Sequence, residues 1–372
     1  MMPQKPKQRI VVAMSGGVDS SVCASLLKQQ GHDVIGMTIK TWSSDECRDE
    51  KSKGCCSLGD IEDARSVARQ IGIPYYVMDL SATFKEKVID YFVDEYLNGR
   101  TPNPCIECNN HIKFGLLSEK AKDLGASFVA TGHYARKGFD TAQGRYFIRE
   151  GLDLSKDQSY VLFGLTQEQL SQVLLPVGEL EKKEVRRMAE ALGLRVFDKP
   201  DSQEICFVSG RYGDFVKKHS PEKTPGAGNI VDSGGQTLGT HEGSHWFTVG
   251  QRKRLKLSSQ MPYFVTEVRP KTNEVVVGLE QDLLVDEMRV HRLNWLLTPR
   301  LGNVEVKIRS HHSKTSAEIV RMADPEVIVR FKMPQKAVTP GQAAVFYEND
   351  RVLGGGWIQS AKVKIPFSFG AV

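Results

Sequence analysis

The chain has 372 residues, of which 40% are hydrophobic and 26% are charged, and its formal net charge is +5. This composition is ordinary for a globular protein and excludes a disordered or collagen-like chain. Because the sequence has no apolar run of about 18 residues, the length of a membrane-spanning helix, and no apolar secretion-signal core, we expect a cytoplasmic protein that does not bind membranes.

Strand and helix signals alternate through the first 200 residues. Short apolar runs rich in Val and Ile are typical of buried parallel strands, and the segments between them carry apolar residues at helical spacing. The expected strands are Arg9–Met14, Asp33–Lys40, Tyr75–Met78 and Phe128–Ala130. The expected helices are Val18–Gln30, Asp60–Ile71 with Asp60 as its N-cap, Phe84–Leu97 and Ile112–Leu124. This alternation predicts a doubly wound, mostly parallel sheet, which binds ligands at the carboxyl ends of its strands.

The pattern changes further along the chain. Helical segments are expected at Asp157–Leu165 and Glu181–Leu192. From about residue 225, Gly and Pro separate short β-rich runs, which predicts one or two small β-barrels or sandwiches. The runs are Asn229–Val231, Phe264–Val268, Glu274–Val277, Val304–Arg309, Val327–Phe331, Ala343–Tyr347 and Val352–Leu353. We therefore expect three domains: a catalytic domain at 1–210, a small central β-rich domain at 211–284 and a C-terminal, barrel-like β-domain at 285–372.

The positive excess lies entirely in the second half of the chain. Residues 1–200 contain 27 basic and 27 acidic side chains, whereas residues 201–372 contain 23 and 18. A C-terminal half that contacts phosphate groups would show this asymmetry, although five charges can also be distributed in this way by chance.

The segment Ser15–Ser21 reads S-G-G-V-D-S-S between the first expected strand and the first expected helix. Gly16 and Gly17 allow close approach of the backbone to a ligand, and a helix N-terminus offers free N–H groups to phosphates. Hydroxyl groups of the loop serines would add donors. The lysine of a Walker A motif is absent. An acidic Asp19 beside phosphates implies a bridging Mg²⁺. The alternative is a tight turn with an ordinary helix cap.

This loop resembles that of the pyrophosphatase-loop family. Members of that family cleave ATP between the α- and β-phosphates and usually adenylate an oxygen atom of a second substrate. The resemblance implies ATP as a substrate, with AMP and pyrophosphate as products, but it leaves the acceptor open.

Seven cysteines in a cytoplasmic chain argue for reactive thiols or metal binding rather than a disulfide framework. Cys105 and Cys108 form a C-x-x-C with no second pair at zinc-ribbon spacing, which leaves a reactive thiol or iron–sulfur ligation. Cys108 is expected just before a helix that starts at Asn109 or Asn110, where the helix N-terminus lowers a thiol pKa. Cys206 is either reactive or a small buried residue, and Cys23 is expected in the core.

Three further cysteines, Cys47, Cys55 and Cys56, fall in a polar loop at residues 43–58. This loop is either a metal site or, with better support, a surface loop with incidental thiols. The histidines His241, His245, His311 and His312 have no metal-ligand spacing, so solvated side chains are expected there.

Longer motifs make the resemblance specific. In order along the chain they are S-G-G-V-D-S-S (15–21), G-R-T-P-N-P (99–104), A-T-G-H-Y (130–134), K-D-Q-S-Y (156–160), P-V-G-E-L-x-K (176–182), I-C-F (205–207), G-Q-R-K (250–253) and T-P-G-Q (339–342). They recur in this order in the tRNA-specific 2-thiouridylases, which the chain resembles almost from end to end. The resemblance implies an adenine-nucleotide α-hydrolase-like first domain. It also implies ATP-dependent thiolation of carbon 2 of the wobble uridine of tRNA.

The same resemblance implies roles for single residues. Cys108 would be the nucleophile and Cys206 the carrier of a persulfide, and a disulfide between them would remain after each turnover. The residues implied to bind ATP are Ala13, Met14, Ser15, Gly16, Gly17, Val18, Asp19, Ser20, Ile39 and Gly132. The residues implied to contact tRNA are Asn103, Pro104, Cys105, His133, Lys156, Asp157, Gln158, Arg309, Ser310 and Gln342. Many relatives have Asp at position 105, and some have an aromatic residue at position 310.

Several alternatives stay open at the level of sequence. Cys105, Cys108 and Cys206 could instead hold three irons of a [4Fe–4S] cluster whose fourth iron carries sulfide. The basic run Gln251–Lys256 is either a solvated hairpin edge or a phosphate contact. The expected partners are the anticodon arm of tRNA and a persulfide donor or relay protein. The rival functions are an ATP-dependent amidotransferase or ligase for a small molecule, and a non-catalytic RNA-binding or iron–sulfur carrier protein.

Overall fold

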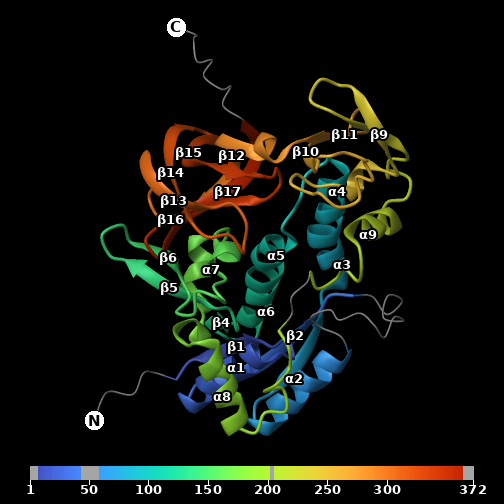
Figure 1. Cartoon of the computed structure of the whole chain (residues 1–372). Coiled ribbons are helices and arrows are strands. Elements are labelled where there is room, and N and C mark those ends of the chain that lie inside the picture. Colours follow the sequence, from blue (N-terminus) through green and yellow to red (C-terminus); the bar gives the residue numbers. More distant parts are fainter. Residues whose placement is uncertain (1–6, 43–57, 202–204, 363–372) are drawn as a thin grey trace.

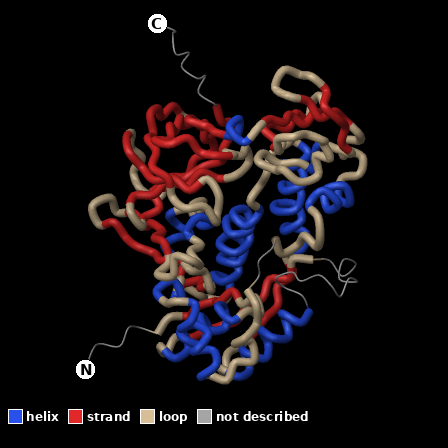
Figure 2. The backbone as a smooth tube through the Cα atoms, viewed as in Figure 1, coloured by secondary structure: helices blue, strands red, loops and turns tan. Residues whose placement is uncertain are grey.

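The computed structural model describes residues 7–42, 58–201 and 205–362. An α/β domain lies at one end of the molecule, and two β-rich parts lie side by side at the other (Figure 1). Strands are concentrated in the two β-rich parts, whereas helices surround the sheet of the first domain (Figure 2). Among these residues, no helix is both long and apolar enough to cross a membrane.

The first domain is built on a parallel sheet, as the alternating pattern predicts. Its strands have the order β3-β2-β1-β4-β7. They are β1 (Arg9–Ala13), β2 (Asp33–Lys40), β3 (Tyr75–Asp79), β4 (Phe128–Ala130) and β7 (Val173–Leu174). The sheet is covered on both faces because its central strand is apolar on both: Ile10 and Val12 pack into one core and Val11 into the other. The doubly wound fold is therefore confirmed.

Helices α1 (Val18–Gln29), α2 (Leu58–Gln70) and α8 (Lys182–Ala191) contribute to the core on one face. Two long helices contribute to the core on the other face. The first consists of α3 (Ser81–Phe84), a π-helical stretch (Lys85–Asp90) and α4 (Tyr91–Leu97). The second consists of α5 (Pro104–Glu107), a π-helical stretch (Cys108–Leu116) and α6 (Leu117–Asp123). In the same domain, a short helix α7 (Gln167–Ser171) and a 3₁₀ turn (Pro176–Glu179) lie on either side of β7.

Two expected helix starts are wrong. The helix expected from Ile112 begins at Pro104, because the side chain of Asn103 caps it by accepting the N–H of Cys105 at 3.1 Å, and proline suits the first helical position. Helix α2 already includes Leu58, so Asp60 lies in its first turn and is not its N-cap. As a result, Cys108 and Asp60 both lie inside a helix rather than at or before its start.

A hairpin of β5 (Ala135–Asp140) and β6 (Arg145–Glu150) was not expected from the sequence. It leaves the first domain and pairs with the C-terminal barrel, where Arg149 lies opposite Arg351. The helix expected at Asp157–Leu165 is only a 3₁₀ turn, Ser159–Leu162, because its preceding residues form the connection from this hairpin.

The C-terminal domain is a closed six-stranded barrel. Its strands are β12 (Leu284–Trp295), β13 (Gly302–Lys307), β14 (Thr315–Ala323), β15 (Glu326–Lys336), β16 (Ala343–Glu348) and β17 (Arg351–Lys362). Antiparallel pairing in the order β12-β15-β14-β13-β16-β17 is closed by pairing of β17 with β12. Closure removes the exposed sheet edges that would otherwise favour aggregation.

The central part contains a four-stranded sheet in the order β10-β11-β8-β9. Its elements are α9 (Tyr212–His219), β8 (Gly228–Val231), β9 (Thr237–His241), a 3₁₀ turn (Ser244–Trp246), β10 (Phe264–Arg269) and β11 (Glu274–Gly278), and a second 3₁₀ turn (Glu280–Leu283) leads into the barrel. Aromatic contacts attach it to the first domain, since Phe92 of α4 lies 6.0 Å from Tyr212 and 5.9 Å from Phe215 of α9.

A buried ionic joint attaches the barrel to the first domain. Lys307 of β13 donates to Asp157 at 2.8 Å and lies 3.4 Å from Glu150, while Lys314 donates to Glu150 at 2.9 Å. The side chains of Asp157, Glu150 and Lys307 are only 2%, 7% and 10% exposed. Burial of such charges is tolerated only because each has a partner of opposite sign.

Two histidines of the central part are buried, contrary to the expectation of solvated side chains. His241 is 7% exposed and His245 is 2% exposed. Neither ring nitrogen of His245 has a hydrogen-bond partner among the described residues. Burial, together with the charge of Lys217, lowers the pKa of His245 to about 4. His311 and His312 are exposed, as expected.

Acidification should therefore destabilise the central part. Since the folded-state pKa lies below the unfolded value of about 6.5, the unfolded chain binds more protons between the two values. We expect the contribution of His245 to be complete above pH 6.5 and to fall by about 3 kcal/mol as the pH drops to 4. Urea unfolding of wild type and His245→Phe across this range measures it. A constant difference between the two proteins would contradict the prediction.

Candidate active site

The Ser15–Ser21 loop connects β1 to α1 at the carboxyl end of the sheet. Met14, the residue just before the loop, is bonded to β2, because its N–H donates to the Met37 carbonyl at 2.9 Å and its carbonyl accepts from the Thr38 hydroxyl at 2.6 Å. Gly17 is the N-cap of α1, and no side chain caps the helix there. The first N–H groups of α1 are therefore left for a ligand, and their geometry suits an anion.

Two glycines are required by the packing of this loop. Gly16 has φ +73°, and a Cβ atom at this position would lie 2.2 Å from the Asp60 carbonyl oxygen. A Cβ at Gly132, which follows β4, would lie 2.7 Å from the Ser20 nitrogen. The chain after β4 is thus packed directly against the first turn of α1, which brings the two implied ATP-binding segments together.

The loop serines shape the loop rather than offering free hydroxyl donors. The Ser20 hydroxyl accepts the Ser15 N–H at 3.1 Å and donates to the Gly17 carbonyl at 3.2 Å, and the Ser21 hydroxyl donates to the same carbonyl at 2.9 Å. Both hydroxyl hydrogens are therefore used inside the protein. Ser20 and Ser21 therefore have no hydroxyl hydrogen free for a phosphate in this arrangement, whereas the backbone N–H groups remain for this role.

The remaining residues implied to bind ATP lie around the same point. Ala13 ends β1, and Met14 and Val18 are buried at 2% and 3% exposure. Ile39 is 8% exposed near the end of β2, opposite Met78 of β3. The structure therefore brings the segment 13–20, Ile39 and Gly132 to one edge of the sheet, where a doubly wound fold binds its ligand.

The carboxylate of Asp19 is paired with a lysine side chain of the same protein. Lys182 of α8 donates to both carboxylate oxygens at 2.7 and 2.8 Å, and the Tyr134 hydroxyl donates to Oδ1 at 2.7 Å. The acid next to the anion site is thus neutralised by Lys182, so its presence there does not by itself require a bridging Mg²⁺. Both oxygens are engaged, and the carboxylate does not fit the role of an open metal ligand.

Two lysines were missed by sequence reasoning. Lys182 ends the P-V-G-E-L-x-K motif, which was a usable signal, but Lys199 lies in no motif. Lys199 donates to the Gly16 carbonyl at 3.1 Å, to Asp60 at 2.7 Å and to Asp63 at 2.6 Å. It therefore ties the segment before Cys206 to the anion-binding loop.

Two of the cysteines face one apolar cluster. Cys108 lies one turn inside its helix rather than before it, and Cys206 lies in a turn of the first domain shortly before α9. Both pack against the cluster formed by β1, β2, the two long helices and α9. Cys105 is exposed, and Cys23 is fully buried as expected. Cys47, Cys55, Cys56 and the stretch Ser202–Glu204 lie outside the described residues.

An iron–sulfur cluster does not fit this arrangement. Within residues 7–42, 58–201 and 205–362, no group of three His, Cys, Asp or Glu side chains is placed to hold a metal. Cys105, Cys108 and Cys206 therefore do not form the ligand set that the cluster alternative requires, whereas a pair of thiols on one cluster is compatible with a disulfide-forming reaction.

Four of the residues implied to contact tRNA already have partners within the protein. His133 is 7% exposed and pairs with the Thr131 hydroxyl at 2.7 Å, and burial and the charge of Lys113 hold its pKa well below the usual value. Asp157 belongs to the buried joint, and Gln158 accepts the Tyr134 N–H at 2.9 Å. Lys156 is the accessible member, with a side chain 35% exposed.

Two of the other implied tRNA contacts, Arg309 and Gln342, line a cavity where the three domains meet. It has a volume of about 440 Å³ and is lined by Thr101, Thr248, Val249, Gly250, Gln251, Arg309, Thr339 and Gln342. Gln342 donates to the Thr101 carbonyl at 2.8 Å, and Arg309 donates to the Ala337 carbonyl at 2.7 Å. Asn103, Pro104 and Cys105 follow directly after Thr101 in the chain, and Ser310 follows Arg309. A nucleotide-sized group would fit this cavity.

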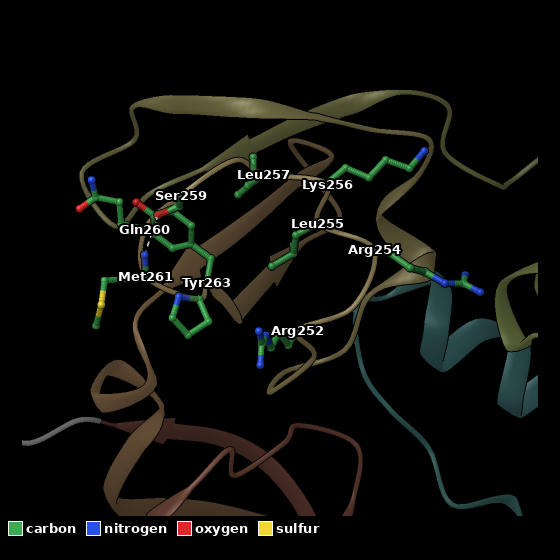
Figure 3. Close-up of a pocket in the computed structure, with 10 residues that line it drawn as sticks. Arg252, Arg254, Leu255, Lys256, Leu257, Ser259, Gln260, Met261 and Tyr263 are labelled. Carbon is green, nitrogen blue, oxygen red and sulfur yellow. Dashed lines mark hydrogen bonds between the residues drawn. The ribbon is translucent and has the colours of Figure 1, made fainter.

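A basic groove lies on the central part. It has a volume of about 260 Å³, and Arg252, Arg254 and Lys256 line it together with Met261 and Tyr263. Figure 3 shows Arg254 and Lys256 extending away from the sheet. Arg254 also lies 5.1 Å from the ring centroid of Trp246. Cations interleaved with aromatic rings are typical of surfaces that contact nucleic-acid phosphates and bases.

Comparison with protein families gives three consecutive matches. A family model described as "tRNA methyl transferase HUP domain" matches residues 8–210. One described as "tRNA methyl transferase PRC-barrel domain" matches residues 213–279, and one described as "Aminomethyltransferase beta-barrel domain" matches residues 285–358.

Curated relatives match over nearly the whole chain. The chain is 49% identical over 360 residues to "tRNA-specific 2-thiouridylase MnmA 1" of Thermoanaerobacter pseudethanolicus, covering 95% of this chain and 99% of that protein. It is 47% identical over 358 residues to "tRNA-specific 2-thiouridylase MnmA" of Clostridioides difficile, with the same coverage. It is also 47% identical over 356 residues to the protein of that name from Clostridium acetobutylicum, again covering 95% and 99%.

The close packing around Gly16 predicts that one added methyl group at this position weakens ATP binding. We expect Gly16→Ala to weaken ATP binding at least tenfold, because alanine is strained at φ +73° and its Cβ would collide with the Asp60 carbonyl. Isothermal titration calorimetry measures the affinity. Gly144→Ala is the matched control, since Gly144 has φ +62° but open space around it. Equal affinities for the two variants would contradict the role of the loop.

Proposed function

The chain belongs to the tRNA-specific 2-thiouridylase family, and we propose on this premise that it uses ATP to replace the oxygen on carbon 2 of the wobble uridine of tRNA with sulfur. The observation that supports this most directly is the presence, in one domain, of an uncapped helix N-terminus for phosphates and two thiols on a shared apolar cluster. The descriptions of the family models refer to methyl transfer, for which paired thiols have no use, so the site favours the sulfur chemistry named for the relatives.

The first step activates the uridine. Oxygen is a poor leaving group from a uracil carbonyl, so the carbonyl oxygen attacks the α-phosphorus of ATP, the bond to the β-phosphate oxygen breaks, and pyrophosphate leaves. The N–H groups at the start of α1 would stabilise the negative charge of the phosphates. Lys182 keeps the carboxylate of Asp19 from repelling them. The product is a base with AMP on its carbonyl oxygen, and AMP is a good leaving group.

The second step delivers sulfur from a persulfide on Cys206. In one route the terminal sulfur attacks carbon 2, AMP leaves, and Cys108 then attacks the Cys206 sulfur to free the 2-thiouridine. In the other, Cys108 attacks the Cys206 sulfur first, and the released sulfide displaces AMP. Both routes end with a Cys108–Cys206 disulfide, which an external dithiol must reduce before the next turnover. A persulfide donor or relay protein reloads Cys206.

The substrate would approach from the β-rich side. The basic groove would contact backbone phosphates of the anticodon arm, and the cavity lined by Arg309 and Gln342 would receive a nucleotide turned out of its stack. ATP and tRNA are both available in the cytoplasm, where we expect the protein to act.

Replacing either Cys108 or Cys206 with serine should separate ATP binding from sulfur delivery. We expect Cys206→Ser and Cys108→Ser each to abolish 2-thiouridine formation while ATP binding is retained, because both sulfur atoms change bonds in the second step. Unmodified tRNA is incubated with protein, ATP with magnesium, and a cysteine desulfurase, and nucleosides are analysed by mass spectrometry. Thiolation adds 16 mass units to uridine.

Cys105→Ser is the control for this experiment. Cys105 is implied to contact tRNA, but serine keeps its size and polarity, and Cys105 is exposed and lies outside the apolar cluster, so we expect thiolation to persist in that variant. Loss of activity in all three serine variants would favour a metal cluster, and an active Cys206→Ser enzyme would exclude the persulfide route.

If the basic groove contacts phosphates, removing one of its cations should change how tRNA affinity depends on salt concentration. We expect Arg254→Gln to weaken tRNA binding and to lower the slope of log affinity against log salt by about 0.7 to 0.9, the effect of losing one phosphate contact. Fluorescence anisotropy at several salt concentrations measures this slope. Lys120→Gln, which removes an exposed cation of α6 paired with Asp123, is the control and should leave the slope unchanged. Identical slopes for wild type and Arg254→Gln would place the RNA elsewhere.

A further inference from the structure

Asp201 sits at a junction of three cations. Its carboxylate lies 2.8 Å from Lys156, 2.9 Å from Lys182 and 3.1 Å from Arg186. Lys156 comes from the segment that follows the β5–β6 hairpin, whereas the other two cations come from α8. Partial burial raises the pKa of Asp201, but hydrogen bonds from Lys156 and Lys182 outweigh this effect and lower it to about 2. The side chain is 22% exposed, so these pairs are only partly screened by water.

One of these cations leads directly to the anion-binding loop. Lys182 is 9% exposed and bonds Asp19 and Asp201 at the same time, at 2.7 and 2.9 Å. Without this lysine the two carboxylates would repel each other across the loop. The chain Asp19–Lys182–Asp201 therefore connects the first turn of α1 to the segment that leads to Cys206.

A second anchor lies on the other side of Cys206. The ring of Phe207 makes edge contacts with Phe84 and Phe92, at centroid distances of 5.7 and 5.3 Å, and lies 5.4 Å from Phe215. These rings belong to the cluster that Cys206 and Cys108 both face. Edge-to-face aromatic contacts fix ring orientation as well as distance.

The two anchors set bounds on the position of Cys206. It is adjacent to Phe207 and five positions after Asp201, so even a fully extended chain would span at most about 18 Å between Asp201 and Cys206. One anchor is electrostatic and is joined to the nucleotide site, and the other is apolar and is joined to the helices beneath the thiols.

We propose that Asp201 and Phe207 are positioning residues that hold Cys206 between the nucleotide loop and the cluster that Cys108 faces. This inference rests on the proposed function for its catalytic meaning. Asp201 sets the position of the sulfur carrier relative to the activated base, and Phe207 sets the position of the thiol on the cluster. Neither residue touches the reacting atoms.

The first test compares two products of one reaction. We expect Asp201→Asn, which keeps the shape and loses the charge, to raise the ratio of pyrophosphate released to 2-thiouridine formed at least fivefold. Activation of the base needs only the loop and ATP, whereas sulfur delivery needs Cys206 in place. Phe207→Ala should raise the ratio similarly, and Phe207→Leu should raise it less because an apolar side chain is retained.

The second test does not depend on catalysis. Alkylation of Cys206 by iodoacetamide, followed by peptide mass spectrometry, should proceed at least threefold faster in Asp201→Asn than in wild type, because the partly buried thiol is released from the cluster. Asp350→Asn is the matched control: Asp350 also pairs with two cations, Arg136 at 3.0 Å and Arg149 at 2.7 Å, but far from the thiols along the hairpin–barrel contact. It should change neither readout.

The outcomes are separable. The inference is overturned if Asp201→Asn has the wild-type ratio of pyrophosphate to 2-thiouridine, even if both products fall together. It is also overturned if the alkylation rate of Cys206 does not change. Absence of 2-thiouridine in the wild-type reaction would instead refute the proposed function, and the alkylation rate would then decide the positioning role alone. Thermal unfolding of each variant identifies a loss of fold, for which Phe207→Leu is the milder substitution.

Discussion

The structure depends on leaving the N-terminus of α1 uncapped. A side-chain cap would satisfy the first N–H groups of the helix and remove the anion site. The helix N-terminus stays uncapped because Gly17, which has no side chain, is the N-cap. The nearby serine hydroxyls donate to the Gly17 carbonyl instead. The loop is then kept rigid by other means, namely its bonds to β2 and its close packing against α2 and the chain after β4.

An acid in this first turn would oppose phosphate binding unless it were neutralised. Lys182 neutralises Asp19 from a helix that follows 163 positions later in the chain. The same lysine bonds Asp201, so the charge balance of the loop also holds Asp201, five positions before Cys206. Asp19 and Asp201 thereby share one cation, which is why we expect substitutions at Asp201 to affect the proposed sulfur delivery more than activation.

The other two domains would complete the proposed substrate surface. The barrel is held to the first domain by the buried charges of Lys307, Asp157 and Glu150, and the central part is held by aromatic contacts between α4 and α9. Between these attachments lies the cavity lined by residues of all three domains. A ligand in this cavity would touch all three domains at once, so the RNA surface depends on domain packing as much as on the basic residues of the central groove.

The parallel sheet, the β-rich second half and the family could all be predicted from the sequence, since apolar periodicity and short motifs are local properties. Only the tertiary structure decided the roles that depend on distant partners. The helix carrying Cys108 begins at Pro104, and Asp157 is a buried joint residue because the unexpected β5–β6 hairpin brings the barrel to it. Asp19 is paired with Lys182, and His133 is buried. Charge pairing and burial are set by segments that meet only after folding, so no local pattern could indicate them.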